Sequence, residues 1–160
     1  MKKYENLELG IAFEYPSDWT SVSHCKAVYG VDVLVHKDLT NFGIMRVSEK
    51  IRTDVISCAK TLEEILKTSI QQNEVIVGSV QLNKYLIGNA ESATIILHKS
   101  YKIGIIIQER TIVVHNNNED QIFIVAFEDL PENYESGYSQ TQLKSILESF
   151  RFLQIKEDKN

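Results

Sequence analysis

The stretch that decides the fold is residues 90–127, AESATIILHKSYKIGIIIQERTIVVHNNNEDQIFIVAF, in which two polar breaks separate three long apolar runs. The runs are residues 92–98, 103–115 and 121–127. They are rich in isoleucine and valine, whose side chains are stiff at χ1 and favour the pleated surface of a sheet. The breaks at residues 99–102 and 116–120 have the length and the polar residues of hairpin turns, so we expect an antiparallel meander.

Both faces of this predicted sheet are apolar. In residues 121–127 one parity holds Ile122, Ile124 and Ala126, and the other holds Phe123, Val125 and Phe127. Successive strand residues point to opposite faces, so both faces need cover. The sequence therefore predicts an α+β fold in which helices flank an antiparallel sheet on both faces, an α/β/α sandwich.

Length and charge limit the classes of protein that the chain can represent. Its 160 residues fit one domain, which we place at residues 1–153, followed by a charged tail at residues 154–160. The formal net charge of −5 disfavours partners that require broad basic patches, namely nucleic acid and anionic membranes. No apolar run approaches the roughly 20 residues of a membrane span, and no secretory signal is visible. We expect a soluble cytoplasmic protein, with a removed leader as the alternative.

The residues before the meander predict further strands. Residues 4–8 are expected to be a polar lead-in, and residues 10–15 a short strand. A turn at residues 16–18 ends this strand. Trp19, which follows the turn, is expected to anchor the core. Further strands are expected at residues 20–27, 31–36, 42–48 and 75–86, with turns at residues 37–41 and 88–89.

Two helices are expected. Thr61 and Glu64 have the spacing of a capping box, which predicts a helix over residues 62–72. A last helix starts at Ser139 or Thr141, and its apolar face consists of Leu143, Ile146, Leu147 and Phe150.

No catalytic or metal-binding pattern stands out. The histidines are His24, His36, His98 and His115. His24 and Cys25 are adjacent on a strand and would face opposite sides, which disfavours a shared metal with His36. We expect His98 to pair near Ile103, far from His115. Cys25 and Cys58 do not form a zinc motif and are expected to be reduced, with a disulfide as the alternative. No nucleophile elbow or phosphate-binding loop is present, so we predict no catalytic residue, cofactor or metal.

The best surface candidate is the acidic, aromatic segment at residues 129–138. Its candidate partner-binding residues are Asp129, Glu132, Tyr134, Glu135 and Tyr138. Tyrosine is favoured at interfaces because it combines an apolar ring with a polar end. The alternative is a solvated loop whose tyrosines fold back on the last helix.

Three features, in this order, resemble the PsbP family, which is named for an extrinsic subunit of photosystem II. They are GIAFEYPSDW at residues 10–19, Asn89-Ala90-Glu91 before the meander, and LESFRF at residues 147–152. The resemblance extends over residues 7–152. It implies an antiparallel sheet flanked by helices. Proteins of this fold mostly bind other proteins: a photosystem core, the GTPase Ran, or toxin segments.

We therefore predict a non-catalytic protein-binding module of PsbP-like fold, whose partner and oligomeric state the sequence leaves open. The alternative is a carrier that holds a small ligand or a metal in a pocket between sheet and helix. An enzyme built from scattered residues is a third possibility.

Overall fold

The computed structural model describes residues 1–22, 31–47, 54–68, 76–82, 84–85, 87–88, 90–100, 106–116 and 121–154. In these ranges the strands are β1 (Lys2–Asn6), β2 (Ile11–Tyr15), β3 (Thr20–Val22), β4 (Val33–Lys37), β5 (Thr40–Arg46), β6 (Ile76–Leu82), β7 (Ser92–Ser100), β8 (Ile106–Asn116), β9 (Gln121–Asp129) and β10 (Arg151–Phe152). The helices are α2 (Val55–Thr68), α4 (Pro131–Glu135) and α5 (Tyr138–Ser149). None of these described helices is both long and apolar enough to cross a bilayer.

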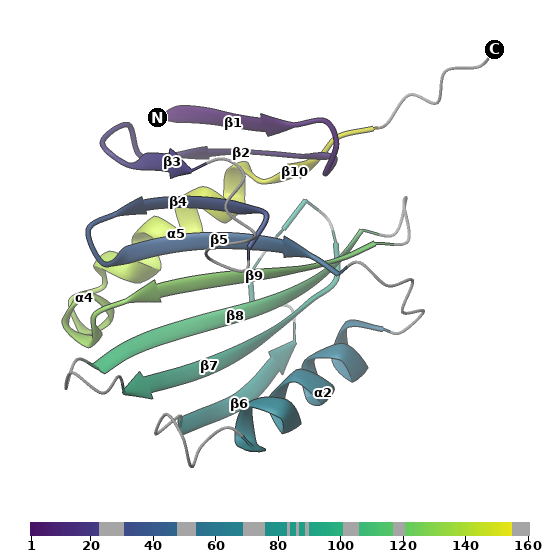
Figure 1. Ribbon diagram of the computed structural model, residues 1–160, viewed down its shortest axis with the longest axis vertical. Helices are drawn as coiled ribbons and strands as arrows, with labels where there is room; N and C mark the ends of the chain where they lie inside the picture. Colours follow the sequence, from purple (N-terminus) through teal and green to yellow (C-terminus); the bar gives the residue numbers. More distant parts are fainter. Residues whose placement is uncertain are drawn as a thin grey trace.

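The strands form two antiparallel sheets (Figure 1). The larger has the order β3-β4-β5-β9-β8-β7-β6, and the smaller has the order β1-β2-β10. Strands β7, β8 and β9 are consecutive neighbours, which confirms the predicted meander.

The register of the first meander hairpin corrects the predicted turn at residues 99–102. Strand β7 continues to Ser100, which pairs with Ile106, and His98 lies opposite Gln108 instead of Ile103. Lysine and serine extend the ladder because its hydrogen bonds join backbone groups of any residue type. Residues 101–105 and 117–120 lie outside the described part.

The small sheet also corrects the prediction at both ends of the chain. The segment expected as a polar lead-in is β1, in which Tyr4 pairs with Phe13 of β2. Strand β10 pairs with the other edge of β2, with Phe152 opposite Ile11. Both are edge strands with exposed residues, so neither shows a strong apolar alternation.

The expected hairpin of β4 and β5 forms with a shorter turn than predicted. Lys37 pairs with Thr40, and Asp38 between them has φ 52°, a backbone conformation that aspartate tolerates better than most residues. Residues 23–27 and 48, assigned to strands from the sequence, lie outside the described part.

Helix α2 begins seven residues before the predicted start. The Asp54 carboxylate accepts a hydrogen bond from the Ser57 amide at 2.7 Å, which is the contact of an N-cap. Thr61 lies inside the helix and donates its hydroxyl to the Ser57 carbonyl at 2.9 Å. The predicted capping box is therefore wrong, because an aspartate upstream supplies the cap. Residues 69–72, the rest of the predicted helix, are not described.

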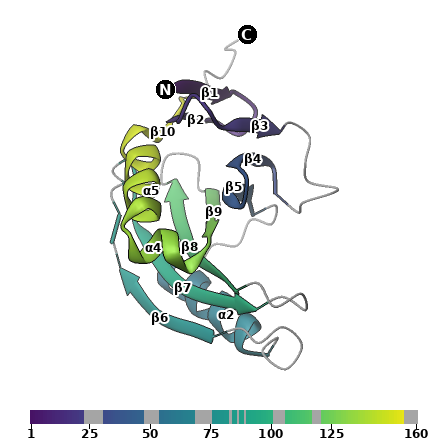
Figure 2. The same cartoon turned by 90° about the vertical axis from the view of Figure 1, so that its left-hand side faces the viewer.

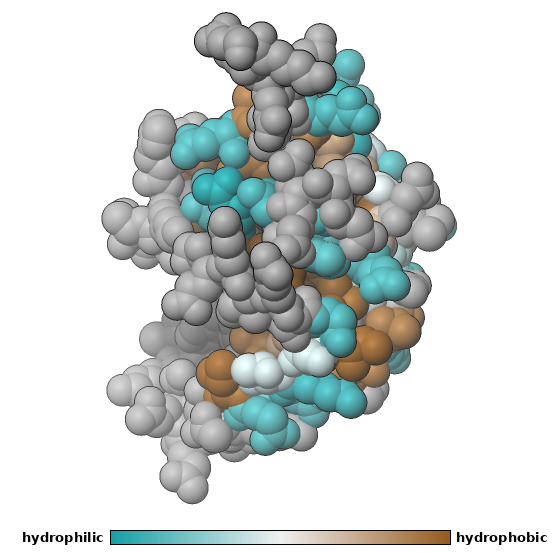
Figure 3. All heavy atoms as spheres, turned by 90° about the vertical axis from the view of Figure 1, so that its right-hand side faces the viewer, coloured by the Kyte–Doolittle hydropathy of each residue, from teal (hydrophilic) through white to brown (hydrophobic). Residues whose placement is uncertain are grey.

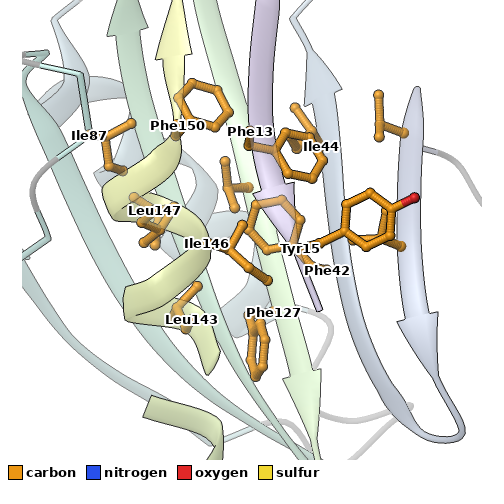
Figure 4. Packing of buried hydrophobic residues seen from close by; sticks show 14 of the residues in the cluster. Phe13, Tyr15, Phe42, Ile44, Ile87, Phe127, Leu143, Ile146, Leu147 and Phe150 are labelled. Carbon is orange, nitrogen blue, oxygen red and sulfur yellow. The ribbon is translucent and has the colours of Figure 1, made fainter. Parts of the chain in front are cut away.

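The main core lies between the two sheets and α5. Leu143, Ile146 and Leu147 of α5 belong to one buried cluster with Phe13 and Phe127, as the helical spacing predicted, and Figure 4 shows Ile146 extending from the helix toward these rings. Trp19 belongs to the same cluster, is 1% exposed, and has its ring centroid 6.4 Å from that of Phe127. The predicted role of Trp19 as a core anchor is confirmed.

A second cluster lies against α2. Val55 and Ala59 of α2 pack there with Ala93, Ile95, Val113 and Ile122. Val113 belongs to this cluster and its neighbour Ile112 to the main core, so the two clusters occupy opposite faces of β8. Figure 2 shows α2 and α5 on different sides of the curved larger sheet.

The predicted α/β/α sandwich is nevertheless not confirmed, although the α+β class and the antiparallel sheets are. The small sheet covers part of the face that α5 covers, and α2 lies mainly against β6, β7 and β8. On the side of the molecule that carries α2, hydrophobic residues reach the surface among hydrophilic ones (Figure 3). Ile65 of α2 is 56% exposed there.

Candidate functional site

The segment predicted as a partner-binding loop is built around a buried carboxylate. Asp129 ends β9 and is fully buried. Its Oδ1 accepts hydrogen bonds from Thr40 Oγ1 at 3.0 Å, the Leu130 amide at 2.8 Å and Asn133 Nδ2 at 2.7 Å. Its Oδ2 accepts one from Ser139 Oγ at 2.9 Å. The carboxylate thus ties β5 to the start of α4 and the start of α5.

Tyr134 of α4 attaches the same segment to β9 through buried contacts with Phe127. Its hydroxyl donates to the Phe127 carbonyl at 3.0 Å, and its ring meets that of Phe127 edge-on at 6.2 Å. Burial raises the pKa of the Tyr134 phenol far above its ordinary value, although the charge of nearby Arg110 acts in the opposite direction. The hydroxyl therefore remains a donor throughout the physiological pH range.

The five candidate residues consequently divide into two groups. Asp129 and Tyr134 are buried, so they support the surface and do not form it. Glu132, Glu135 and Tyr138 are exposed. Sequence reading missed this division because Pro131 starts a short helix, α4, in a segment that its polar composition predicted as a loop.

The β4–β5 turn lies next to this segment. A shallow cavity of about 410 Å³ is lined by Lys37, Asp38, Leu39, Thr40, Asp129, Leu130, Asn133 and Tyr138. At its edge, Lys37 Nζ lies 2.6 Å from Asp18 Oδ2, and this hydrogen bond lowers the pKa of the Asp18 carboxyl. Leu39 at the tip of the turn is 44% exposed. We call the exposed Leu39, Glu132, Glu135 and Tyr138 the corner surface.

A second cavity lies between α5 and the larger sheet. It measures about 380 Å³ and is lined by Lys84, Tyr85, Arg110, Gln140, Lys144, Leu147 and Glu148. The sequence reading missed it because Arg110 lies inside an apolar run, where it read as an ordinary strand residue. The signal that could have revealed this cavity is Arg110 itself, a charged residue inside a strand predicted to be buried on both faces.

Arg110 is the unusual member of this cavity. It is 8% exposed, and its guanidinium carbon lies 4.8 Å from the centre of the Tyr134 ring. Lys84 extends over the ring of Tyr85, with Nζ 5.8 Å from the ring centre. Partial desolvation at the cavity lowers the pKa of the exposed Lys84, and the charge of Arg110 lowers it further. Two cations therefore face one small cavity.

The histidines and cysteines do not assemble into a site within the described residues. No three of the described His, Cys, Asp and Glu side chains are grouped to hold a metal ion. His36 lies on β4 and His115 on β8, with β5 and β9 between them. Cys58 is a free thiol whose partial burial raises its pKa. His24 and Cys25 lie outside the described residues, and His98 lies opposite Gln108, seven positions along β8 from His115.

A family model described as PsbP-like protein matches residues 1–152. The chain belongs to the PsbP-like family. This membership confirms the resemblance that the opening, middle and closing motifs indicated. The search of curated proteins returned no match for this PsbP-like protein.

Two solved structures share the fold of this PsbP-like protein. The solution structure of cyanobacterial PsbP (CyanoP) from Synechocystis sp. PCC 6803 superposes with a TM-score of 0.68 at 12% identity, covering 94% of this chain and 91% of that one. The crystal structure of LpqN, involved in cell envelope biogenesis of Mycobacterium tuberculosis, has a TM-score of 0.58 at 10% identity, covering 90% and 83%. At such identities the likeness shows the fold alone.

Proposed function

We propose that this PsbP-like protein is a non-catalytic binding module that recognises another protein through the corner surface. The observation that supports this proposal is the Asp129 network, which joins β5, α4 and α5 by four hydrogen bonds of 2.7–3.0 Å. A surface whose supporting residues are held in this way is preorganised, so little conformational freedom is lost when a partner binds.

The chemistry of the corner surface defines the kind of partner. Tyr138 and Leu39 are 37% and 44% exposed and offer apolar area, while Glu132 and Glu135 add two negative charges. Aromatic anchors supply much of the affinity of protein interfaces, and complementary charges at the rim increase the rate and specificity of association. The expected partner therefore presents an apolar pocket bordered by lysine or arginine.

The test compares partner capture by three baits. Wild-type protein is crosslinked in a lysate of the source cell beside a corner variant, which combines Tyr138→Ala, Glu132→Lys and Glu135→Lys. The control, Glu5→Lys with Glu8→Lys, reverses two exposed charges near the first strand. We expect the corner variant to capture roughly tenfold less of a stoichiometric partner than wild type, as measured by mass spectrometry. The control should capture as much of this partner as wild type does. Equal capture by the corner variant and the control contradicts the proposal.

A second candidate function is that of a small-ligand carrier, and the cavity beneath α5 favours it. Its volume of about 380 Å³ lies in the range of small-molecule sites, and Leu147 and Tyr85 give it apolar walls. Native mass spectrometry after gentle purification tests this function, because a bound small molecule adds a defined mass. A protein of unmodified mass contradicts tight retention of a ligand.

A further inference from the structure

Arg110 combines deep burial with missing hydrogen-bond acceptors. Its side chain is 8% exposed, and neither Nε nor Nη1 has a hydrogen-bond partner among the described residues. A guanidinium is charged at all physiological pH values and offers five donors in a planar fork. Buried charges are normally paired, so an arginine in this state indicates a missing acceptor at the same place.

The ring of Tyr134 holds the Arg110 guanidinium in place. The Tyr134 ring, 4.8 Å from the guanidinium carbon, contributes a cation–π contact that carries no negative charge. The Tyr134 hydroxyl is already used, because it donates to the Phe127 carbonyl. The guanidinium therefore has a fixed position in the wall of the cavity.

The charges around the cavity favour an anion. Lys84 is a second cation in the lining, and its pKa is lowered by partial desolvation and by the charge of Arg110. The third cation, Lys144, lies 3.8 Å from the Glu148 carboxylate, and both of these side chains are largely exposed at the rim. Because the charges of Lys144 and Glu148 cancel, the lining keeps a net positive charge from Arg110 and Lys84.

The remaining lining limits the size and character of the ligand. Tyr85 and Leu147 contribute apolar surface, and Gln140 contributes one amide. A cavity of about 380 Å³ holds a small molecule and not a folded partner. An oxyanion on a small apolar body matches both the cations and the walls.

We propose that this cavity is a binding site for a small organic oxyanion, whose carboxylate or phosphate accepts hydrogen bonds from Arg110 and whose charge is shared with Lys84. The proposal rests on the second candidate function and names its ligand class. The planar fork of Arg110 suits two parallel hydrogen bonds to one carboxylate or phosphate group.

Three probes test the site by titration calorimetry on the full chain at constant ionic strength: benzoate, inorganic phosphate and the neutral benzamide. We expect saturable binding of benzoate or phosphate and none of benzamide. Binding of benzoate alone identifies an organic carboxylate as the ligand, and binding of phosphate identifies a phosphate group. Arg110→Gln should weaken binding by tenfold or more, since charged hydrogen bonds to the anion are lost.

Two further variants keep the test decisive if Arg110→Gln does not fold. Lys84→Met removes an exposed cation of the cavity, and Lys60→Met removes an exposed lysine of α2 as its matched control. We expect weaker oxyanion binding only in Lys84→Met. The proposal is overturned if wild type binds neither oxyanion, or if Lys84→Met binds as wild type does. Equal binding of benzamide and benzoate also overturns it, while leaving a carrier of neutral ligands possible.

Discussion

Two buried charged side chains on the same face of the larger sheet, Asp129 and Arg110, differ in how fully they are hydrogen-bonded. Asp129 accepts hydrogen bonds from Thr40, Leu130, Asn133 and Ser139, whereas Arg110 has two nitrogens without an acceptor among the described residues. Satisfied buried polar groups stabilise one structure, and unsatisfied ones cost free energy. The aspartate is therefore explained by folding, and the proposed oxyanion would supply the acceptors that the arginine lacks.

The role of Asp129 can be tested by its removal. Asp129→Ala leaves the buried hydroxyls of Thr40 and Ser139 without their acceptor. We expect the free energy of unfolding to fall by roughly 3 kcal/mol, measured by urea denaturation. Glu135→Ala on the same corner surface is the control and should change this free energy by less than about 0.5 kcal/mol. A similarly small effect of Asp129→Ala refutes the supporting role of the carboxylate.

At the scale of elements, the strands were more predictable than the helix boundaries. β-branched runs identified β7, β8 and β9 because a two-faced central strand leaves a strong apolar signal. The start of α2 was missed because Asp54 and Thr61 both precede helix-like patterns, and only the fold shows which one caps. The edge strands β1 and β10 were missed because pairing with β2, and not their own composition, makes them strands.

The cap of α2 gives a prediction with a defined pH dependence. The hydrogen bond from the Ser57 amide lowers the pKa of the Asp54 carboxyl. A lowered folded-state pKa gives stability that is present above the unfolded pKa, about 4, and is lost as the pH falls through the folded value. Asp54→Ala should therefore lower the melting temperature at pH 7, and the difference from wild type should shrink at pH 3.

Asp54→Asn separates the cap from its charge. Asparagine caps helices about as well as aspartate and does not titrate. We expect this variant to melt close to wild type at pH 7 and to lack the acid-dependent loss, as followed by circular dichroism. A pH-independent difference between wild type and Asp54→Ala contradicts the assignment.

For the whole molecule, the main core joins both sheets and α5 into one unit. Phe13 of the small sheet lies 5.3 Å from Phe42 of the larger sheet and 6.2 Å from Phe150 at the end of α5, measured between ring centres. The sequence indicated these apolar faces. It did not indicate that β2 belongs to a separate sheet, because alternation identifies a strand but not its neighbours.

This shared core predicts cooperative unfolding. Phe13→Ala should lower the free energy of unfolding by about 3–5 kcal/mol, since it removes a buried aromatic side chain. In wild type and variant alike, the fluorescence of Trp19 and the far-ultraviolet circular dichroism should change at the same urea concentration. Separate midpoints show instead that the small sheet unfolds independently.

The edges of the two sheets decide how another chain can approach. In the described part of the chain, β10 has two residues, and the ladder between β6 and β7 slips between Val77 and Val80. Strand β1 begins with Lys2 and Lys3. Short, irregular or lysine-bearing edges are poor templates for a further strand. A partner of the proposed binding module would thus be recognised by side chains and not by adding a strand, and the same edges disfavour polymerisation strand to strand.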